Sequence, residues 1–335
     1  MRPFEAVPFR RDLGVPLLLA AAGCLTILFD TRVLGLPIVG AGFWLAGAGI
    51  TAALVPARTR IDRFLATLTF AFACLAVVAE ALSLVVLLGS PTAWIVEAVL
   101  CGIVGCLLPR RYQLRRDAAA PSWRSVLVGL GLLPADGEQL TLWRRAAMLA
   151  AGALTLAVAV HLAVTFLLTW FSGITVGDSI THYLPRSIRF LQYGTFGIFE
   201  TYYDFMQYLH QTVVAAELLF LRSDVLVNPT SFAAFALTSV GVYVLARSLG
   251  WPAPYPLFAA LAPLSMPILL LHASTSNFDT FTALWLVLAL YFLRRGFATS
   301  TPGWLLVAAA ATALLFASKP TAWFAMPGVG LVWLG

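Results

Sequence analysis

The chain has 335 residues, of which 61% are hydrophobic and 11% are charged, and its mean hydropathy is +0.90. Soluble domains are about half apolar and about a quarter charged. The balance in this chain excludes a water-soluble enzyme, a disordered chain, a collagen-like fibre and a disulfide scaffold. It predicts a protein of the lipid bilayer.

The net charge of +6 comes almost wholly from arginine, because Lys319 is the only lysine among 21 basic residues. Most arginines lie in short clusters between apolar runs, which is typical of topology control and of contact with anionic lipids. We therefore expect membrane lipids as partners and no nucleic acid. The cysteines, Cys24, Cys74, Cys101 and Cys106, lie in apolar segments and indicate core positions, with neither a disulfide nor a zinc site.

Apolar segments long enough to cross a bilayer recur along the whole chain. A spanning helix needs about 20 mostly apolar residues. The candidate spans are 14–29, 34–55, 64–88, 94–108, 146–170, 229–246, 255–271, 278–293 and 304–316. A last apolar segment, 323–335, is shorter, and we expect the chain as given to end within a helix and to be incomplete. The pattern predicts an all-α polytopic membrane protein with about ten transmembrane helices.

The distribution of arginine predicts the orientation. With the N-terminus in the cytoplasm and one crossing per span, 16 of the 21 basic residues fall on the cytoplasmic side. This holds only if nothing crosses between 171 and 228. We therefore interpret the apolar stretch 205–221 as an interfacial helix lying on the membrane, with His210 and Glu217 on one polar face.

These segments divide the chain into three parts. Residues 1–108 form a four-helix membrane region, and 109–145 form a cytoplasmic linker. Residues 146–335 form a second membrane module, whose long outer loop, 171–228, contains interfacial helices. We expect a multi-pass protein of the cell membrane.

The outer loop contains the first candidate catalytic group. Asp178 follows a turn at Gly177, directly after a span, and His182, Arg186 and Arg189 continue at helical spacing. A carboxylate here could accept the proton of an acceptor hydroxyl as that hydroxyl attacks. The alternative is that Asp178 only caps the helix that follows.

Two further outer loops each add one charged residue. Asp279 lies near the start of a span, where an acid is costly and usually functional, although it could instead cap the helix. Lys319 lies between two spans and could snorkel to the headgroups or contact a phosphate oxygen. Together the loops favour an anionic, lipid-bound substrate, such as a phosphate on an isoprenoid tail.

The segment GDSITHYLPRSIRFLQYGTF (177–196), the acid after the next span and the lysine-containing turn resemble a known family. They are similar to the GT-C-type membrane glycosyltransferases, in particular to bacterial members related to protein mannosyltransferases and aminoarabinose transferases. The resemblance covers 146–335. It implies transfer of a sugar from a polyprenyl-phosphate donor to a hydroxyl of a glycan, lipid or protein acceptor on the periplasmic or extracellular face.

The resemblance also implies roles for individual residues. Asp178 would be the general base, Asp279 a second acid that orients the acceptor or a metal, and Lys319 a contact of the donor phosphate. The expected substrate-binding residues are His182, Tyr183, Arg186, Arg189, His210, Glu217 and Lys319. No cofactor is predicted with certainty, and a divalent metal could be held by Asp178, by Asp279 or by the stripe of His210 and Glu217.

Two other function classes stay open. A transporter or lipid flippase would use Glu80, Glu97 and Asp279 as relay groups, with Pro263 and Pro267 breaking a helix near the midplane. A non-catalytic scaffold would use its four N-terminal spans to recruit a partner. The transporter needs a path through the bilayer and no long outer loop, and the scaffold predicts that Asp178→Asn leaves the phenotype intact.

Overall fold

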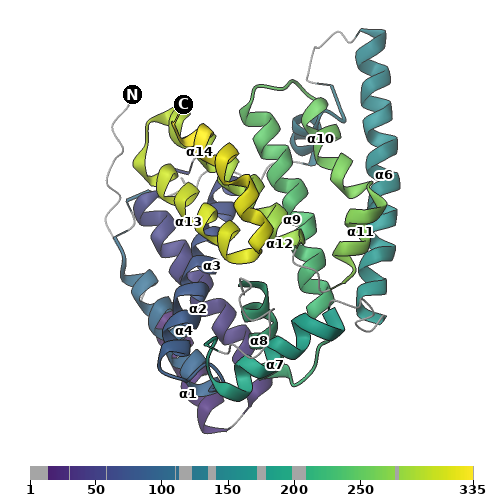
Figure 1. The fold of residues 1–335 in the computed structure, drawn as a ribbon. Helices are drawn as coiled ribbons and strands as arrows, with labels where there is room; N and C mark the ends of the chain where they lie inside the picture. Colours follow the sequence, from purple (N-terminus) through teal and green to yellow (C-terminus); the bar gives the residue numbers. More distant parts are fainter. Residues whose placement is uncertain are drawn as a thin grey trace.

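The structure is a computed structural model that describes residues 14–29, 31–57, 59–109, 111–112, 123–134, 141–171, 179–197, 209–275 and 279–334. Within these ranges every regular element is helical, which confirms the predicted all-α class. Figure 1 shows the helices as one bundle with α6 along its side. The first half contains α1 (Gly14–Leu28), α2 (Arg32–Leu54), α3 (Arg60–Leu84), α4 (Pro91–Leu107), α5 (Trp123–Leu130) and α6 (Leu142–Phe171).

The second half begins with a short π-helix, η1 (Ser179–Tyr183), which continues directly into α7 (Leu184–Tyr193). Residues 179–193 of the predicted outer loop are therefore helical, and the loop itself stays a prediction. The remaining elements are α8 (Leu209–Leu221), α9 (Val227–Ser248), α10 (Tyr255–Leu264), α11 (Pro267–Ala273), α12 (Asp279–Thr299), α13 (Pro302–Ser318), the 3₁₀ helix η3 (Pro320–Ala325) and α14 (Met326–Leu334).

Several helices have the length and composition of membrane spans. In the described part of the chain, α2, α3, α6, α9 and α12 qualify, and the bent pair of α10 and α11 adds a sixth if it is one span. The helices α1, α4, α8 and α13 are apolar but shorter. The structure therefore supports a multi-pass membrane protein with five or six candidate spans, and the figure of ten stays a prediction.

The predicted span 255–271 is broken in two. Its halves, α10 and α11, meet at an angle of 65°. Pro267 at the start of α11 has no N–H to continue the hydrogen-bond ladder, and the preceding Met266 is extended, with φ −82° and ψ 119°. Pro263 lies in the last turn of α10. The prolines therefore break this helix, as the transporter alternative expects.

Two hydrophobic cores join the N-terminal helices to the rest of the chain. One contains Leu65 of α3 together with Trp285 of α12. The other contains Trp94 of α4 together with Phe220 of α8. The four N-terminal helices thus pack both against the second membrane module and against the predicted outer loop.

The helix α8 differs from its predicted setting. Ten of its 13 residues are buried, among them His210, Gln211 and Glu217. It packs against α7 and α2, with smaller contacts to α3 and α13. The polar face was predicted to lie in the membrane surface, but its side chains are buried against other helices: Glu217 contacts Thr230 of α9, and His210 contacts Phe281 of α12.

Candidate functional site

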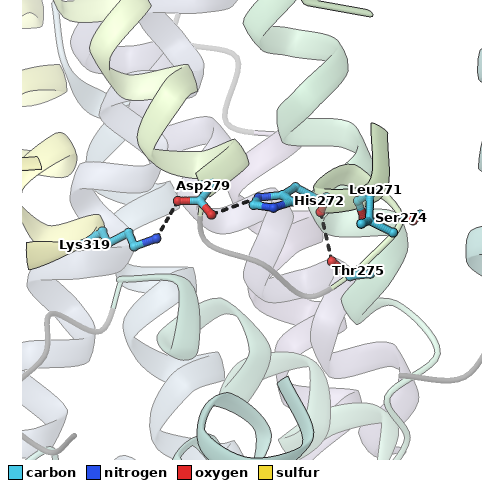
Figure 2. Close-up of polar contacts among 6 residues, drawn as sticks. All are labelled: Leu271, His272, Ser274, Thr275, Asp279 and Lys319. Carbon is cyan, nitrogen blue, oxygen red and sulfur yellow. Dashed lines mark hydrogen bonds and ion pairs between the residues drawn. The ribbon is translucent and has the colours of Figure 1, made fainter. Parts of the chain in front are cut away.

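Three polar side chains from separate helices meet at one place, shown in Figure 2. Asp279 is the first residue of α12, His272 lies near the end of α11, and Lys319 directly follows α13. Lys319 Nζ donates a hydrogen bond to Asp279 Oδ1 at 2.6 Å, and His272 Nδ1 lies 2.9 Å from Asp279 Oδ2. We call these three residues the Asp279 cluster.

Local features of the chain bring the cluster together. Because α12 and α13 form an antiparallel hairpin, the start of α12 and the end of α13 are neighbours, although Asp279 and Lys319 are 40 positions apart. Lys319 is extended, with φ −157° and ψ 142°, and is followed by Pro320, so α13 ends before it. An acid in the first turn of α12 also suits the positive end of the helix dipole.

The third member is positioned by the short helix α11. Its direction after the proline break carries His272 to the start of α12. Two hydroxyls bond to carbonyls in the last turn of α11. Ser274 Oγ donates to the Leu271 carbonyl at 2.9 Å, and Thr275 Oγ1 donates to the His272 carbonyl at 3.2 Å (Figure 2). Ser274 and Thr275 are therefore tied to the last turn of α11, next to the histidine.

The Asp279 cluster is partly open to its surroundings. The side chains of His272, Asp279 and Lys319 are 28%, 33% and 25% exposed. Both carboxylate oxygens are engaged, one by a cation and one by an imidazole. Such a set can donate hydrogen bonds to a phosphate through the ammonium and accept them from hydroxyls. In the described ranges no group of three or more His, Cys, Asp or Glu residues could hold a metal ion, and the divalent metal stays a prediction.

A second polar group lies inside the protein around α8. The Thr230 hydroxyl, in the first turn of α9, donates to Glu217 Oε1, and Glu217 Oε2 is buried with no hydrogen-bond partner among the described residues. Burial raises the pKa of Glu217 from 4.5 to about 7, against the lowering effect of the Thr230 hydrogen bond. The charge of this carboxyl therefore changes near neutral pH.

His210 occupies the opposite end of α8. Its ring lies edge-on to Phe281, with centroids 5.2 Å apart, and Phe281 is two residues after Asp279 on α12. Burial lowers the pKa of His210 to about 3, so its imidazole is neutral at physiological pH. His210 and Glu217, seven positions apart on α8, contact different helices, α12 and α9.

The candidates on η1 and α7 differ in their burial. Arg186 is buried, and its guanidinium carbon lies 5.1 Å from the centre of the Phe190 ring. His182, Tyr183 and Arg189 are half-buried. Asp178, the predicted general base, lies outside the described residues.

Of the predicted site residues, the structure thus brings Asp279 and Lys319 into direct contact. It also adds His272, which was not among the predicted site residues. The available signal was its place at the start of the same outer loop, seven positions before Asp279. The hydropathy pattern indicates only that His272 follows the end of a predicted span. Its contact with Asp279 depends on the angle between α11 and α12, which the sequence does not predict.

Comparison of the chain with models of protein families, with curated proteins and with solved structures found no match.

Proposed function

We propose that the chain is a GT-C-type membrane glycosyltransferase. It moves a sugar from a polyprenyl-phosphate donor to a hydroxyl of a glycan, lipid or protein acceptor at the outer face of the membrane. The observation that carries the proposal is the 2.6 Å contact between Lys319 and Asp279. The sequence places these two residues, from separate loops, at one membrane face that suits an anionic, lipid-bound substrate, and their contact supports a common site.

In the proposed reaction Asp178 takes the proton of the acceptor hydroxyl. The hydroxyl oxygen attacks the anomeric carbon, the bond from that carbon to the phosphate oxygen breaks, and polyprenyl phosphate leaves with the electron pair. Lys319 stabilises the charge that grows on the phosphate, as preorganised cations commonly do. Asp279 holds the ammonium in place. Arg186 and Arg189 belong to the predicted outer loop that contains Asp178.

The proposed topology has ten spans with a cytoplasmic N-terminus. It counts the shorter helices α1, α4 and α13 and the final apolar segment as crossings. Three arginines that the topology places on the cytoplasmic side bond to segments placed on the same side. Arg295 bonds to Asp62, Arg63 to the Tyr112 carbonyl and Arg247 to the Gly129 carbonyl. These contacts support one cytoplasmic end of the helix bundle. Asp279 begins α12, about 24 Å along the helix from Arg295. The Asp279 cluster then belongs to the outer end.

A transporter or lipid flippase is the second candidate, and the broken helix favours it. Discontinuous helices frame the substrate sites of many transporters. The bend of 65° between α10 and α11 is such a break. The two candidates differ in chemistry, because a flippase moves the lipid without changing a covalent bond.

Binding of a long-chain polyprenyl phosphate to the purified chain tests the proposal, with the uncharged polyprenol of equal length as the comparison ligand. We expect the phosphate to bind more tightly, and Lys319→Ala to weaken its binding about 10- to 100-fold, because charge-assisted hydrogen bonds contribute about 1.5–3 kcal/mol. The matched control is Arg222→Ala, an exposed cation of the predicted outer loop. Equal binding of phosphate and alcohol would overturn the donor assignment.

The transferase and the flippase are separated by a second measurement. In proteoliposomes with polyprenyl-phosphate sugar and a hydroxyl acceptor, a transferase produces a glycosylated acceptor and free polyprenyl phosphate. A flippase only moves the intact lipid between leaflets. Loss of product in Asp178→Asn, with product retained in Asp224→Asn, is the result expected for the transferase, because Asp224 is an exposed acid of the same loop.

A further inference from the structure

The contact between His272 and Asp279 identifies which nitrogen of the imidazole donates to the carboxylate. A carboxylate can only accept hydrogen bonds, so the 2.9 Å contact requires the hydrogen to be on His272 Nδ1. In the neutral ring the second nitrogen, Nε2, then carries the lone pair and acts as an acceptor. In this neutral form Asp279 is a positioning residue: it holds Nδ1 as the donor and leaves Nε2 as the acceptor.

Lys319 holds the same carboxylate from its other side. Its ammonium donates to Asp279 Oδ1, while His272 approaches Oδ2 (Figure 2). Rotation of the carboxylate would break both contacts, so each partner fixes the position of the other. One carboxylate thus separates a group that only donates, the ammonium, from a group that accepts, the imidazole Nε2.

These two characters suit two adjacent parts of one substrate. The oxygens of a phosphodiester only accept hydrogen bonds and match the ammonium of Lys319. A sugar hydroxyl can donate one, and it matches the Nε2 acceptor of His272. In a glycosyl phosphate the sugar hydroxyls begin one carbon away from the phosphate-bearing carbon. A single donor headgroup can therefore reach across the carboxylate to both residues.

We infer that His272 is a specificity-determining residue that accepts a hydrogen bond from a hydroxyl of the donor sugar while Lys319 binds the phosphate. The inference rests on the proposed function and adds the recognition of the sugar to it. It leaves the proton transfer with Asp178. It assigns His272 to the hydroxyl-bearing part of the donor and Asp279 to the positioning of both neighbours.

The test compares binding of polyprenyl phosphate with binding of polyprenyl phosphates that carry glucose, mannose, galactose or arabinose. The quantity measured is the sugar increment, which is the ratio of the dissociation constants without and with the sugar. For the sugar that gives the largest increment, we expect His272→Phe to reduce it about three- to tenfold, as expected for one hydrogen bond between neutral groups. Binding of the sugar-free phosphate should change little. The matched control is His161→Phe on the exposed side of α6.

A second measurement tests the positioning role of Asp279 without any ligand. The chain has four histidines, so nitrogen-15 labelling of histidine gives few signals, and His272→Phe identifies the one that belongs to His272. We expect the neutral tautomer with the proton on Nδ1. Asp279→Asn should abolish this preference, since an amide can offer either a donor or an acceptor to Nδ1. An Nε2-protonated ring in the unmodified protein would overturn the inference.

The outcomes separate this inference from the proposed function. If the unmodified protein binds no polyprenyl phosphate, the proposed function fails, and the tautomer measurement still reports on the Asp279 cluster. If it binds the phosphate but shows no sugar increment, or if His272→Phe keeps the full increment, the role of His272 is overturned while the donor assignment stands.

Discussion

Asp62, in the first turn of α3, accepts a hydrogen bond of 2.7 Å from the Arg295 guanidinium near the end of α12, although 233 positions separate the two residues. The Tyr291 hydroxyl donates to the other oxygen of the same carboxylate. The Arg295 guanidinium also lies over the ring of Trp304, 5.3 Å from its centre. These contacts tie the N-terminal helices to α12, the helix that begins with Asp279. The N-terminal region is therefore part of the packed body that holds the candidate site.

The first prediction concerns this link. Asp62→Asn leaves the partly buried guanidinium without its carboxylate, and we expect it to lower the free energy of unfolding by about 2–4 kcal/mol, because removing one partner leaves the other uncompensated. Arg295→Gln should cost a similar amount, and the double variant should cost less than the sum of the two. Thermal unfolding in detergent measures this. The control is Arg294→Gln, an exposed neighbour, and additive effects would contradict the link.

A second prediction concerns the close approach of α2 and α4. A Cβ atom on Gly49 would lie 2.0 Å from the Gly105 carbonyl oxygen, and backbone cannot give way as a side chain can. We expect Gly49→Ala to destabilise the protein by about 1–3 kcal/mol through overpacking. Gly40→Ala, on the same helix, has no atom within 4 Å of the new Cβ and should be neutral or slightly stabilising. Equal melting temperatures for the two variants would show that α2 and α4 do not pack this closely.

The sequence predicted those parts of the fold that depend on local pattern. Runs of apolar residues located the helices, and the break between α10 and α11 lies at Pro263 and Pro267, which only the transporter alternative had singled out. The spacing of Asp279 and Lys319 around one helical hairpin placed both at the same end of the molecule. Predicting these features requires only the helix repeat, the length of a membrane span and the missing N–H of proline.

Other features depend on how helices meet and could not be predicted. A polar stripe such as that of Glu217 looks the same whether it faces water or a neighbouring helix, so the burial of α8 was not foreseen. The partnership of Asp62 with Arg295 joins distant segments and has no local signature. His272 was passed over for the same reason, because only the angle between α11 and α12 brings it to Asp279.

A third prediction follows from Glu217, which belongs to the predicted outer loop. Its pKa is raised by burial to about 7 from 4.5, so the folded protein binds this proton more tightly than the unfolded chain does. The contribution to stability is therefore complete below pH 4.5, decreases as the pH rises, and is lost above about 7, by an amount on the order of 3 kcal/mol.

Glu217→Gln keeps an oxygen for the Thr230 hydroxyl but cannot ionise. We expect its melting temperature to change less across this interval than that of the unmodified protein. The control, Asp224→Asn, removes an exposed acid and should leave the slope unchanged. Parallel pH profiles for the Glu217 variant and the unmodified protein would show that this carboxyl titrates at its ordinary pKa.

The last prediction concerns the charge beside Lys319. Asp279 neutralises the ammonium at 2.6 Å, so a phosphate that binds Lys319 also experiences the repulsion of the carboxylate. We expect Asp279→Asn to bind sugar-free polyprenyl phosphate about three- to tenfold more tightly, because it removes a like charge within a few ångströms at a partly exposed site. The gain should shrink as salt is added. The same variant should lose most of the sugar increment, since the His272 tautomer is no longer fixed. Affinity for the bare phosphate and preference for the sugar would thus move in opposite directions, whereas a general loss of structure at the start of α12 would weaken both.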